Sequence, residues 1–357
     1  MKNKRNKIIK TAHGNLKTPF FMPDATRGYI KLTNNKELKK TGVGAMVVNT
    51  FHLYLQPGIK LIKKAGGIHQ FMNYDKPLLS DSGGFQVFSL IHQNPKMGKI
   101  YDDKVVFKSP IDGSMHEMTP EKSIQIQFDL GVDMMVCFDD CPPNGLCESY
   151  LKKSVERTIQ WAERCKSEYN WQVKSRKLKI ESYQAPLLFG VIQGGNYKEL
   201  RKYCAEELIK LDLDGYGFGA RPVDVDGNFL GEILKFTADL IPEDKLRFAL
   251  GVGTPEDIIR SYELGWDMFD CVIPTREGRH GRLFKVKKNK WGYETFNINN
   301  AKFSKDFSSI NKDSEIPDLR DYSKAYLHHL FRMKEHLGYK LASLNNLEFY
   351  SNLIKGL

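Results

Sequence analysis

Short apolar runs recur along most of the chain, and each ends in a small or polar residue. Among them are VGAMVVNTF, VDMMVCFDD, PLLFGVIQGG and DMFDCVIPT. Such runs are apolar on both faces, which is typical of parallel strands buried beneath helices. Helix-like segments lie between them, and both TPEKSIQIQFDLG and TPEDIIRSYELG begin with an N-capping Thr followed by Pro and Glu. Strand and helix alternate over roughly 230 residues, which predicts a (β/α)8 barrel or a doubly wound sheet.

Polar residues and glycines follow directly on several of the apolar runs, and this favours the barrel. In a (β/α)8 barrel the reactive groups collect at the C-terminal ends of the strands. We therefore predict an α/β fold in which residues 1–285 form a (β/α)8 TIM barrel. After Gly278 the sequence becomes basic and alternating, then polar, then helical, so residues 286–357 are predicted to form a small C-terminal subdomain. The residues at the predicted strand ends are Asp81, Asp139, Gln193, Gly194, Gly195 and Asp270.

The charge of the chain points to a polyanionic partner. Lys and Arg number 54 against 43 acidic residues, which gives a net charge of +11 and favours nucleic acid over an acidic small molecule. No apolar stretch is long enough for a signal-peptide core or a membrane span. Six cysteines without a CxxC pair suit reduced thiols. We expect a cytoplasmic protein without membrane contact.

Three carboxylates at the predicted rim suggest acid, base or nucleophile chemistry. A pair of carboxylates is the usual equipment for cleaving a glycosidic bond. The alternative is that each Asp caps a helix or closes a turn. The stretch SDSGGFQVF places Asp81 beside a Gly-Gly pair and an aromatic ring, as suits the close approach of backbone to a flat ligand.

The other polar groups complement the edge of a guanine base. Asp139 and Asp140 can accept from ring and exocyclic N–H groups, while the amide of Gln193 offers both a donor and an acceptor. Three arginines follow Asp270 closely, where they could hold phosphates next to a reacting sugar; the alternative is a solvated basic loop. They are Arg276, Arg279 and Arg282.

These segments together resemble one family. SDSGGFQVFSL, SPIDGSMHEMTPEKSIQIQ, CFDDCPP, GVIQGG, LGVGTPEDI, MFDCVIPTREGRHG and YSKAYLHHL are similar to motifs of the tRNA-guanine transglycosylases, or queuine tRNA-ribosyltransferases, over nearly the whole chain. The resemblance implies a (β/α)8 barrel that exchanges the wobble guanine of certain tRNAs, in a U-G-U context, for a 7-deazaguanine of the preQ1 or queuine type. It also implies a homodimer and no energy-rich cofactor.

The resemblance implies a role for each rim residue. Asp270 would attack the ribose C1′ and hold the RNA as a covalent glycosyl enzyme, and Asp81 would be the general acid and base. Two successive displacements at C1′ retain its configuration. The base would be bound by Asp139, Gln193, the Gly194-Gly195 turn, Cys141 and Ala220, with Phe85 and Leu250 on the two faces of its ring.

Two stretches depart from the family pattern. In FGARPVDVDGN, Ala220 replaces a glycine, Arg221 adds a charge, and Asp224 or Val225 stands where the family has Gly-Glu. The departure leaves open which 7-substituted base is used. An aminomethyl group would need an acceptor there, and a cyclopentenediol would need room and hydroxyl partners.

The second departure concerns a structural zinc site that the family carries near its C-terminus. The positions that match its three cysteines and its histidine hold Ser314, Ile316, Leu319 and Asn345. We therefore expect no metal and no other cofactor, with side-chain packing in place of the zinc. The nearby histidines have no recognisable ligand spacing, and packing or RNA contact is the alternative for them; they are His328, His329 and His336.

Two other functions stay open at this point. One is a non-catalytic tRNA-binding or partner subunit, which the presence of both Asp81 and Asp270 disfavours. The other is a related enzyme that inserts deazapurines into DNA. The C-terminal segment and the arginine-rich loop favour tRNA over DNA.

Overall fold

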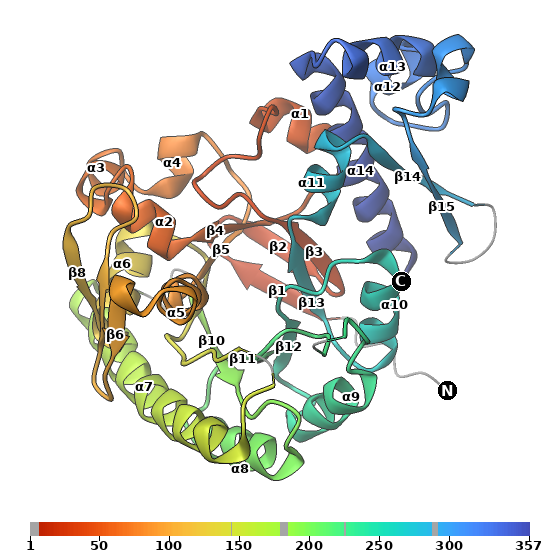
Figure 1. The fold of residues 1–357 in the computed structure, drawn as a ribbon. Coiled ribbons are helices and arrows are strands. Elements are labelled where there is room, and N and C mark those ends of the chain that lie inside the picture. Colours follow the sequence, from red (N-terminus) through yellow and green to blue (C-terminus); the bar gives the residue numbers. More distant parts are fainter. Residues whose placement is uncertain (1–6, 144, 179–184, 225, 288–291) are drawn as a thin grey trace.

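Eight parallel strands form the centre of the molecule (Figure 1). The structure is a computed structural model that describes residues 7–143, 145–178, 185–224, 226–287 and 292–357. The strand order β3-β13-β12-β11-β10-β9-β5-β4 confirms the predicted (β/α)8 barrel. The strands are β3 (Phe20–Pro23), β4 (Met46–Asn49), β5 (Leu78–Asp81), β9 (Met134–Val136), β10 (Leu187–Ile192), β11 (Gly215–Phe218), β12 (Leu246–Ala249) and β13 (Met268–Cys271).

The two outer strands of this order meet just beyond β3. Asp24 forms a parallel bridge with Val47. The amide of Ala25 donates to the Val47 carbonyl at 2.7 Å, and the amide of Asn49 donates to the Thr26 carbonyl at 2.9 Å. These bonds nearly close the barrel between β3 and β4.

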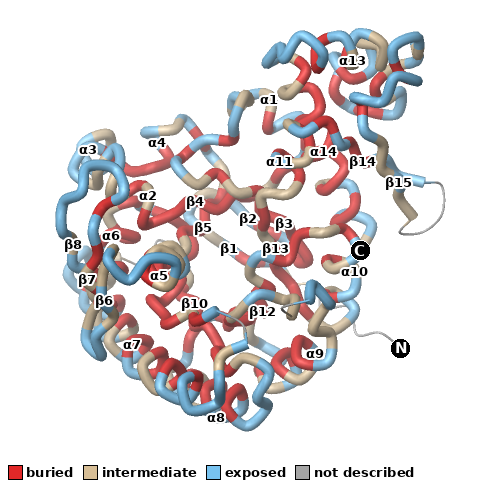
Figure 2. The backbone as a smooth tube through the Cα atoms, in the orientation of Figure 1, coloured by how far each residue is buried: buried red, intermediate tan, exposed pale blue. Residues whose placement is uncertain are grey.

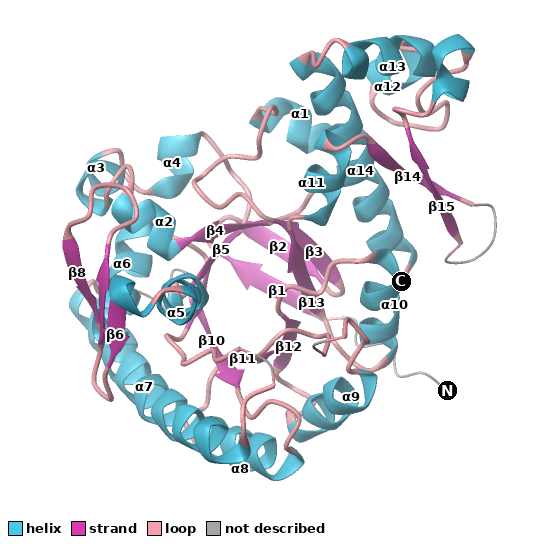
Figure 3. Ribbon diagram, viewed as in Figure 1, coloured by secondary structure: helices cyan, strands magenta, loops and turns pink. Residues whose placement is uncertain are grey.

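Helices surround the barrel and cover the strands (Figure 3). The predicted Thr caps are present: Thr119 Oγ1 accepts from the Lys122 amide at 3.1 Å, and Thr254 Oγ1 accepts from the Asp257 amide at 3.2 Å. The helices up to the last barrel strand are α1 (Asn35–Lys40), α2 (Thr50–Leu55), α3 (Ile59–Lys64), α4 (Ile68–Met72), α5 (Gly84–Gln93), α6 (Pro120–Leu130), α7 (Glu148–Ser175), α8 (Lys198–Ile209), α9 (Gly231–Leu240) and α10 (Pro255–Glu263). None of the described helices combines the length and the apolar character that a membrane crossing requires.

An N-terminal hairpin covers the end of the barrel where the strands begin. It consists of β1 (Ile8–Thr11) and β2 (Gly14–Lys17), paired antiparallel. Its side chains Ile9 and Leu16 pack into the same cluster as the residues that fill the barrel interior. A separate antiparallel sheet between α5 and α6 contains β6 (Gly98–Ile100), β7 (Val105–Lys108) and β8 (Met115–Met118), preceded by the short helix η1 (Pro95–Met97).

The chain after β13 forms a second group of elements and then returns to the barrel. Its elements are α11 (Ile273–Arg279), the pair β14 (Arg282–Val286) and β15 (Tyr293–Asn297), η2 (Ala301–Lys305), α12 (Pro317–Asp321), α13 (Lys324–Arg332) and α14 (His336–Gly356). Early in α14, Leu341 and Leu344 pack into a small cluster with Leu283. Later in α14, Tyr350 packs into the main core, and its hydroxyl donates to the Gly253 carbonyl at 2.7 Å. Buried positions accordingly run along much of this helix (Figure 2). The division at residue 285 stays a prediction.

Candidate active site

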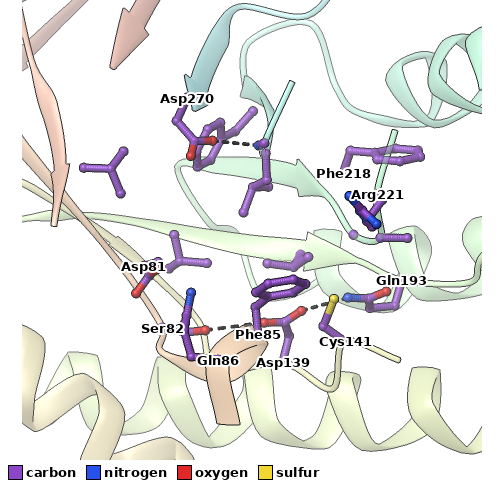
Figure 4. Close-up of a pocket in the computed structure, with 18 of the residues that line it drawn as sticks. Asp81, Ser82, Phe85, Gln86, Asp139, Cys141, Gln193, Phe218, Arg221 and Asp270 are labelled. Atoms are coloured by element: carbon purple, nitrogen blue, oxygen red, sulfur yellow. Dashed lines mark hydrogen bonds between the residues drawn. The ribbon is translucent and has the colours of Figure 1, made fainter. Parts of the chain in front are cut away.

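A cavity of about 260 Å³ lies at the C-terminal ends of the barrel strands (Figure 4). Both candidate catalytic carboxylates and most of the candidate base-binding residues line it. Gly194 does not line it, and Gly195 lines an adjoining cavity of about 230 Å³ that shares Gln193 and Ala220 with the first. The lining residues singled out from the sequence are Asp81, Asp270, Asp139, Gln193, Phe85, Leu250, Ala220, Arg221 and Cys141.

Asp81 is the last residue of β5, and three donors hold its carboxylate. Asn49 lies opposite it in the β4–β5 register, and its side-chain amide donates to Asp81 Oδ2 at 2.5 Å. The amides of Thr50 and Gly83 each donate to Oδ1 at 3.1 Å. Burial raises the pKa of Asp81 to about 7 despite these bonds. An acid with a pKa near neutrality is well suited to proton transfer at physiological pH.

Asp270, in β13, faces the same cavity from the other side of the barrel (Figure 4). The amide of Gly251 donates to its Oδ1 at 2.8 Å. Burial raises the pKa of Asp270 to about 7, and the negative charge of Asp24 adds to the effect, while the bond from Gly251 opposes it. One cavity thus contains two carboxyl groups that can each carry or release a proton near pH 7.

Asp139 and Gln193 form a polar edge of the cavity. Gln193 Nε2 donates to Asp139 Oδ2 at 2.8 Å, and Ser82 Oγ donates to Asp139 Oδ1 at 3.4 Å. Burial raises the pKa of Asp139 to about 6. A Cβ on Gly219 would come within 2.5 Å of the Gln193 side chain, so a larger residue here would displace Gln193 from its place beside Asp139. Asp140, also predicted at the base edge, is not part of this polar edge. Its Oδ2 accepts from Arg157, on α7, at 2.5 Å.

Ala220 has a backbone conformation that is unusual for a residue with a side chain. Its φ of 89° lies in the left-handed region. Ala220 and Cys141 both line the cavity, and burial raises the pKa of the Cys141 thiol to about 12. A strained backbone position and a neutral thiol therefore both border the cavity.

The substituted loop after Ala220 is partly described. Arg221 lines the cavity (Figure 4). Asp224 is bonded within its own loop, where its Oδ1 accepts from the amides of Asp226 at 2.9 Å and Asn228 at 2.8 Å. Val225 lies outside the described residues.

Phe85 and Leu250 provide apolar surface in the cavity from different sides of the barrel. Phe85, on α5, is 53% exposed although it lines the cavity. Leu250 follows β12 directly and is only partly buried. Exposed aromatic and aliphatic surface of this kind suits the two faces of a planar ring.

The three arginines lie beside the strand that carries Asp270. Arg276 and Arg279 are on α11, and Arg282 begins β14. Arg276 and Arg282 are exposed, and their guanidinium groups lie 3.5 and 3.8 Å from the Glu277 carboxylate. Burial and the charge of Arg276 lower the pKa of Arg279. The chain therefore has a basic edge next to the cavity.

The four positions of the family's zinc site do not fit a zinc ion. Ile316 and Leu319 are buried and apolar, and Ser314 Oγ donates to Glu348 Oε2 at 2.6 Å. Asn345 Nδ2 donates to the Phe284 carbonyl at 2.9 Å. None of the four supplies the thiolate or imidazole that structural zinc prefers.

The histidines near these positions have other neighbours. His328 Nδ1 lies 2.7 Å from the Ile298 carbonyl. The rings of His329 and His336 lie near tyrosine rings, those of Tyr326 and Tyr339. Contacts of this kind are typical of packed helices.

Among the described residues, one cluster has side chains of the types that bind metal ions, and it lies away from the cavity. It contains His13, His69 and Asp133. The two imidazole rings are stacked 3.5 Å apart and nearly parallel, and one nitrogen of each ring contacts the Asp133 carboxylate, His13 Nδ1 at 2.9 Å and His69 Nε2 at 3.2 Å. Hydrogen bonding accounts for this cluster better than metal coordination.

Several residues around the cavity were missed in the sequence. Asn49 and Thr50 end the apolar run VGAMVVNTF and could have been recognised as residues at a strand end. Phe218 and Arg201 carry no such signal, because Phe218 is part of an apolar strand and Arg201 lies in an ordinary amphipathic helix.

Comparisons with known proteins identify the family of this chain. The family model described as Queuine tRNA-ribosyltransferase matches residues 2–357. A protein of that name from Thermoanaerobacter pseudethanolicus is 44% identical over 353 residues, 99% of this chain and 88% of its own length. Those from Caldanaerobacter subterraneus and Bacillus subtilis are 44% and 40% identical, over 98% and 97% of this chain and 87% and 86% of their own lengths. The chain belongs to the queuine tRNA-ribosyltransferase family.

Proposed function

We propose that this protein is a tRNA-guanine transglycosylase that exchanges the wobble guanine of tRNA for a 7-deazaguanine in queuosine modification. The observation that carries the proposal is the shared cavity, in which Asp81 and Asp270 face the polar edge formed by Asp139 and Gln193. Family membership supports tRNA as the substrate and pentosyl transfer as the reaction. Nothing on the described residues favours the non-catalytic or the DNA-modifying alternative.

The first half of the reaction removes guanine. The Asp270 carboxylate attacks C1′ of the ribose, and the C1′–N9 bond breaks with its electron pair going to the base. Asp81 donates a proton to the departing base, which leaves as neutral guanine. The RNA is then held on Asp270 as a glycosyl ester with inverted configuration at C1′.

The second half installs the new base. Asp81, now a carboxylate, removes the proton from N9 of the incoming 7-deazaguanine, and N9 attacks C1′. The bond between C1′ and Asp270 breaks, which restores the free carboxylate and the original configuration. No electrons are gained or lost overall, so the exchange needs no redox cofactor.

The cavity edge supports recognition of a guanine-like base. The Asp139 carboxylate can accept from N1–H and the 2-amino group, while the Ala220 amide and Gln193 can bond to the 6-oxo group. Phe85 and Leu250 would cover the two ring faces. Arg221 borders the region in which the resemblance places the 7-substituent, and its charge would disfavour a cationic substituent unless other groups offset it.

The basic edge supports binding of the anticodon arm. Guanidinium groups of Arg276, Arg279 and Arg282 would bind phosphates that flank the reacting nucleotide, which the resemblance places in a U-G-U sequence. The proposal includes a cytoplasmic location, where tRNA would be available. A homodimer is a further expectation from the resemblance, and light scattering of the purified protein would test it.

The test is a base-exchange assay with an adduct assay beside it. A tRNA transcript that carries labelled guanine at the wobble position is incubated with the protein and a 7-deazaguanine base. We expect label release, and a covalent protein–RNA adduct on denaturing gels that Asp270→Asn abolishes. Asp244→Asn is the matched control, since Asp244 is exposed and precedes β12 at the opposite end of the barrel. Absence of both label release and adduct in the wild-type protein would overturn the proposal.

A further inference from the structure

A fully buried arginine lies behind the polar edge of the cavity. Arg201, on α8, is 0% exposed. Its guanidinium donates to three backbone carbonyls, from Nε to Gly195 at 2.6 Å and from the two terminal nitrogens to Ile192 at 3.0 Å and Gly219 at 2.9 Å. Burial of a charged group is costly unless its donors are satisfied. The three hydrogen bonds therefore offset the free-energy cost of burying the Arg201 charge.

The three carbonyls belong to two loops that meet at the cavity. Ile192 ends β10, Gly195 lies in the turn that follows it, and Gly219 follows β11 directly. The Arg201 guanidinium also lies over the ring of Phe218, 4.0 Å from its centroid. Arg201 thus ties the loop that carries Gln193 to the loop that carries Ala220.

The bond to Gly219 fixes the direction of the next amide. In a trans peptide the C=O of one residue and the N–H of the next point in opposite directions. The Gly219 carbonyl points at Arg201, so the Ala220 N–H points away from Arg201, and Ala220 itself lines the cavity. The left-handed φ of Ala220 is the kind of conformation that persists only where the surroundings impose it.

We propose that Arg201 is a positioning residue that aims the Ala220 amide at the 6-oxo group of the base. The inference rests on the proposed function, because it assumes that a guanine-like base occupies the cavity. Arg201 does not line the cavity itself, so it acts on the base only through the peptide that it holds.

A lysine would not replace this arginine. The planar guanidinium presents several donors in fixed directions, whereas an ammonium is a single point of charge on a flexible stem. Burial lowers the pKa of Arg201 to about 9, so the group stays a cation at neutral pH. One guanidinium group can therefore hold all three carbonyls at once.

The test compares two bases that differ at one atom. 7-Deazaguanine and its 6-thio analogue share N1–H and the 2-amino group, but sulfur is the weaker acceptor. The ratio of kcat/KM for the two bases is measured with wild-type protein, Arg201→Lys and Arg201→Gln. We expect kcat/KM for 7-deazaguanine, divided by kcat/KM for the 6-thio analogue, to fall about tenfold in both variants. The reason is that a misdirected amide no longer binds the 6-oxo group more tightly than the 6-thio group.

Arg247→Lys is the matched control. Arg247 is also buried, and it donates to the Ile241 and Gly265 carbonyls at 2.7 and 3.4 Å. Those carbonyls lie at the opposite end of the barrel, before β12 and β13. We expect its substitution to lower the melting temperature while the ratio stays at the wild-type value.

Each outcome has a distinct meaning. If the wild-type protein exchanges neither base, the proposed function fails and not the role of Arg201 within it. If the wild-type protein is active and the Arg201 variants keep its ratio, Arg201 is a structural residue only. Hydrogen exchange of the wild-type protein gives a measurement that needs no variant: 7-deazaguanine must slow exchange at the Ala220 amide, and unchanged exchange there would overturn the inference.

Discussion

The carboxylates at the ends of β5 and β13 are poised between two protonation states at neutral pH. Burial raises the pKa of both Asp81 and Asp270 to about 7. The proposed reaction begins with Asp81 as the acid and Asp270 as the carboxylate. Because each charge disfavours the other, the apparent pKa values of the reaction belong to the pair rather than to either residue.

The rate of base exchange should therefore depend on pH as a narrow bell. We expect kcat/KM to peak near pH 7, to fall at lower pH as Asp270 takes up a proton, and to fall at higher pH as Asp81 loses its proton. Initial rates from pH 5 to 9 at constant ionic strength measure the profile. A rate that stays constant from pH 5 to pH 8 would contradict the roles assigned to these two groups.

Ala220 should respond to loss of its methyl group with a gain in stability. Its φ of 89° strains a residue with a Cβ but not glycine. Ala220→Gly should raise the free energy of unfolding by roughly 0.5–1 kcal/mol, offset in part by the greater freedom of glycine in the unfolded chain. Urea denaturation measures the change, and Ala205→Gly within α8 is the control that should destabilise by about 1 kcal/mol.

The catalytic candidates were predictable from the sequence because each follows an apolar run. Asp81, Asp139, Gln193 and Asp270 are at strand ends, where a barrel gathers its polar groups. Arg201 was not predictable, since a basic residue within an amphipathic helix is normally solvent-exposed. Its burial depends on two loops that come together only in the folded protein.

At the scale of elements, a buried cluster ties the N-terminal hairpin to the barrel. Asp133, just before β9, accepts from the His13 amide at 3.1 Å and from the Leu78 amide at 2.9 Å. Its carboxylate also lies 2.9 Å from His13 Nδ1 and 3.2 Å from His69 Nε2. Burial opposes ionisation, but these bonds outweigh it and hold the pKa of Asp133 well below its usual range. The bond to Asp133 raises the pKa of His13.

Asp133→Asn should destabilise the protein by about 2–4 kcal/mol, because it leaves buried donors unpaired. The contribution of Asp133 is lost only at acid pH, below its unfolded pKa near 4. The contribution of His13 is complete below about pH 6.5 and is lost as pH rises through its folded pKa. The difference from wild type should accordingly be larger at pH 5.5 than at pH 8.5.

Urea denaturation at the two pH values measures this prediction. Asp129→Asn is the control, since Asp129 pairs with Lys63 and Arg176 nearer the surface and should matter by less than about 1 kcal/mol. Equal losses of stability in the two variants would show that the cluster adds nothing beyond a surface ion pair.

The segment around Ser314 should be insensitive to chelators. Packing of Ile316 and Leu319, and the bond from Ser314 to Glu348, hold it together. We expect EDTA to leave the melting temperature unchanged. Elemental analysis that finds about one tightly held zinc per chain would contradict this expectation.

The packing of α14 into both the small cluster around Leu283 and the main core could not be predicted from its sequence. A helix with one apolar stripe predicts one buried face, but residues buried in α14 include Asn345, Asn346 and Glu348 as well as apolar side chains. These polar groups bond to neighbouring backbone; Asn346, for example, accepts from the Phe284 amide at 3.0 Å. Such partners are distant in sequence, so periodicity alone cannot reveal them.

At the scale of the whole molecule, the net charge of +11 should make tRNA binding depend strongly on salt. Replacing both Arg276 and Arg282 with Gln should reduce the slope of log K against log salt by about 0.7 for each phosphate that is no longer neutralised. Filter binding from about 50 to 300 mM salt measures the slope. The control is Arg260→Gln, at an exposed position on α10, which should leave the slope unchanged. A slope equal to wild type in the double variant would exclude Arg276 and Arg282 from phosphate binding.

The position of α14 has a consequence for how the protein is made. This helix packs against β3, the first barrel strand, and against α11, which follows the last. A nascent chain on the ribosome therefore displays the part of β3 that α14 covers throughout the synthesis of every other barrel strand, until α14 itself has been translated. We therefore expect the nascent chain to bind chaperones that recognise exposed apolar segments.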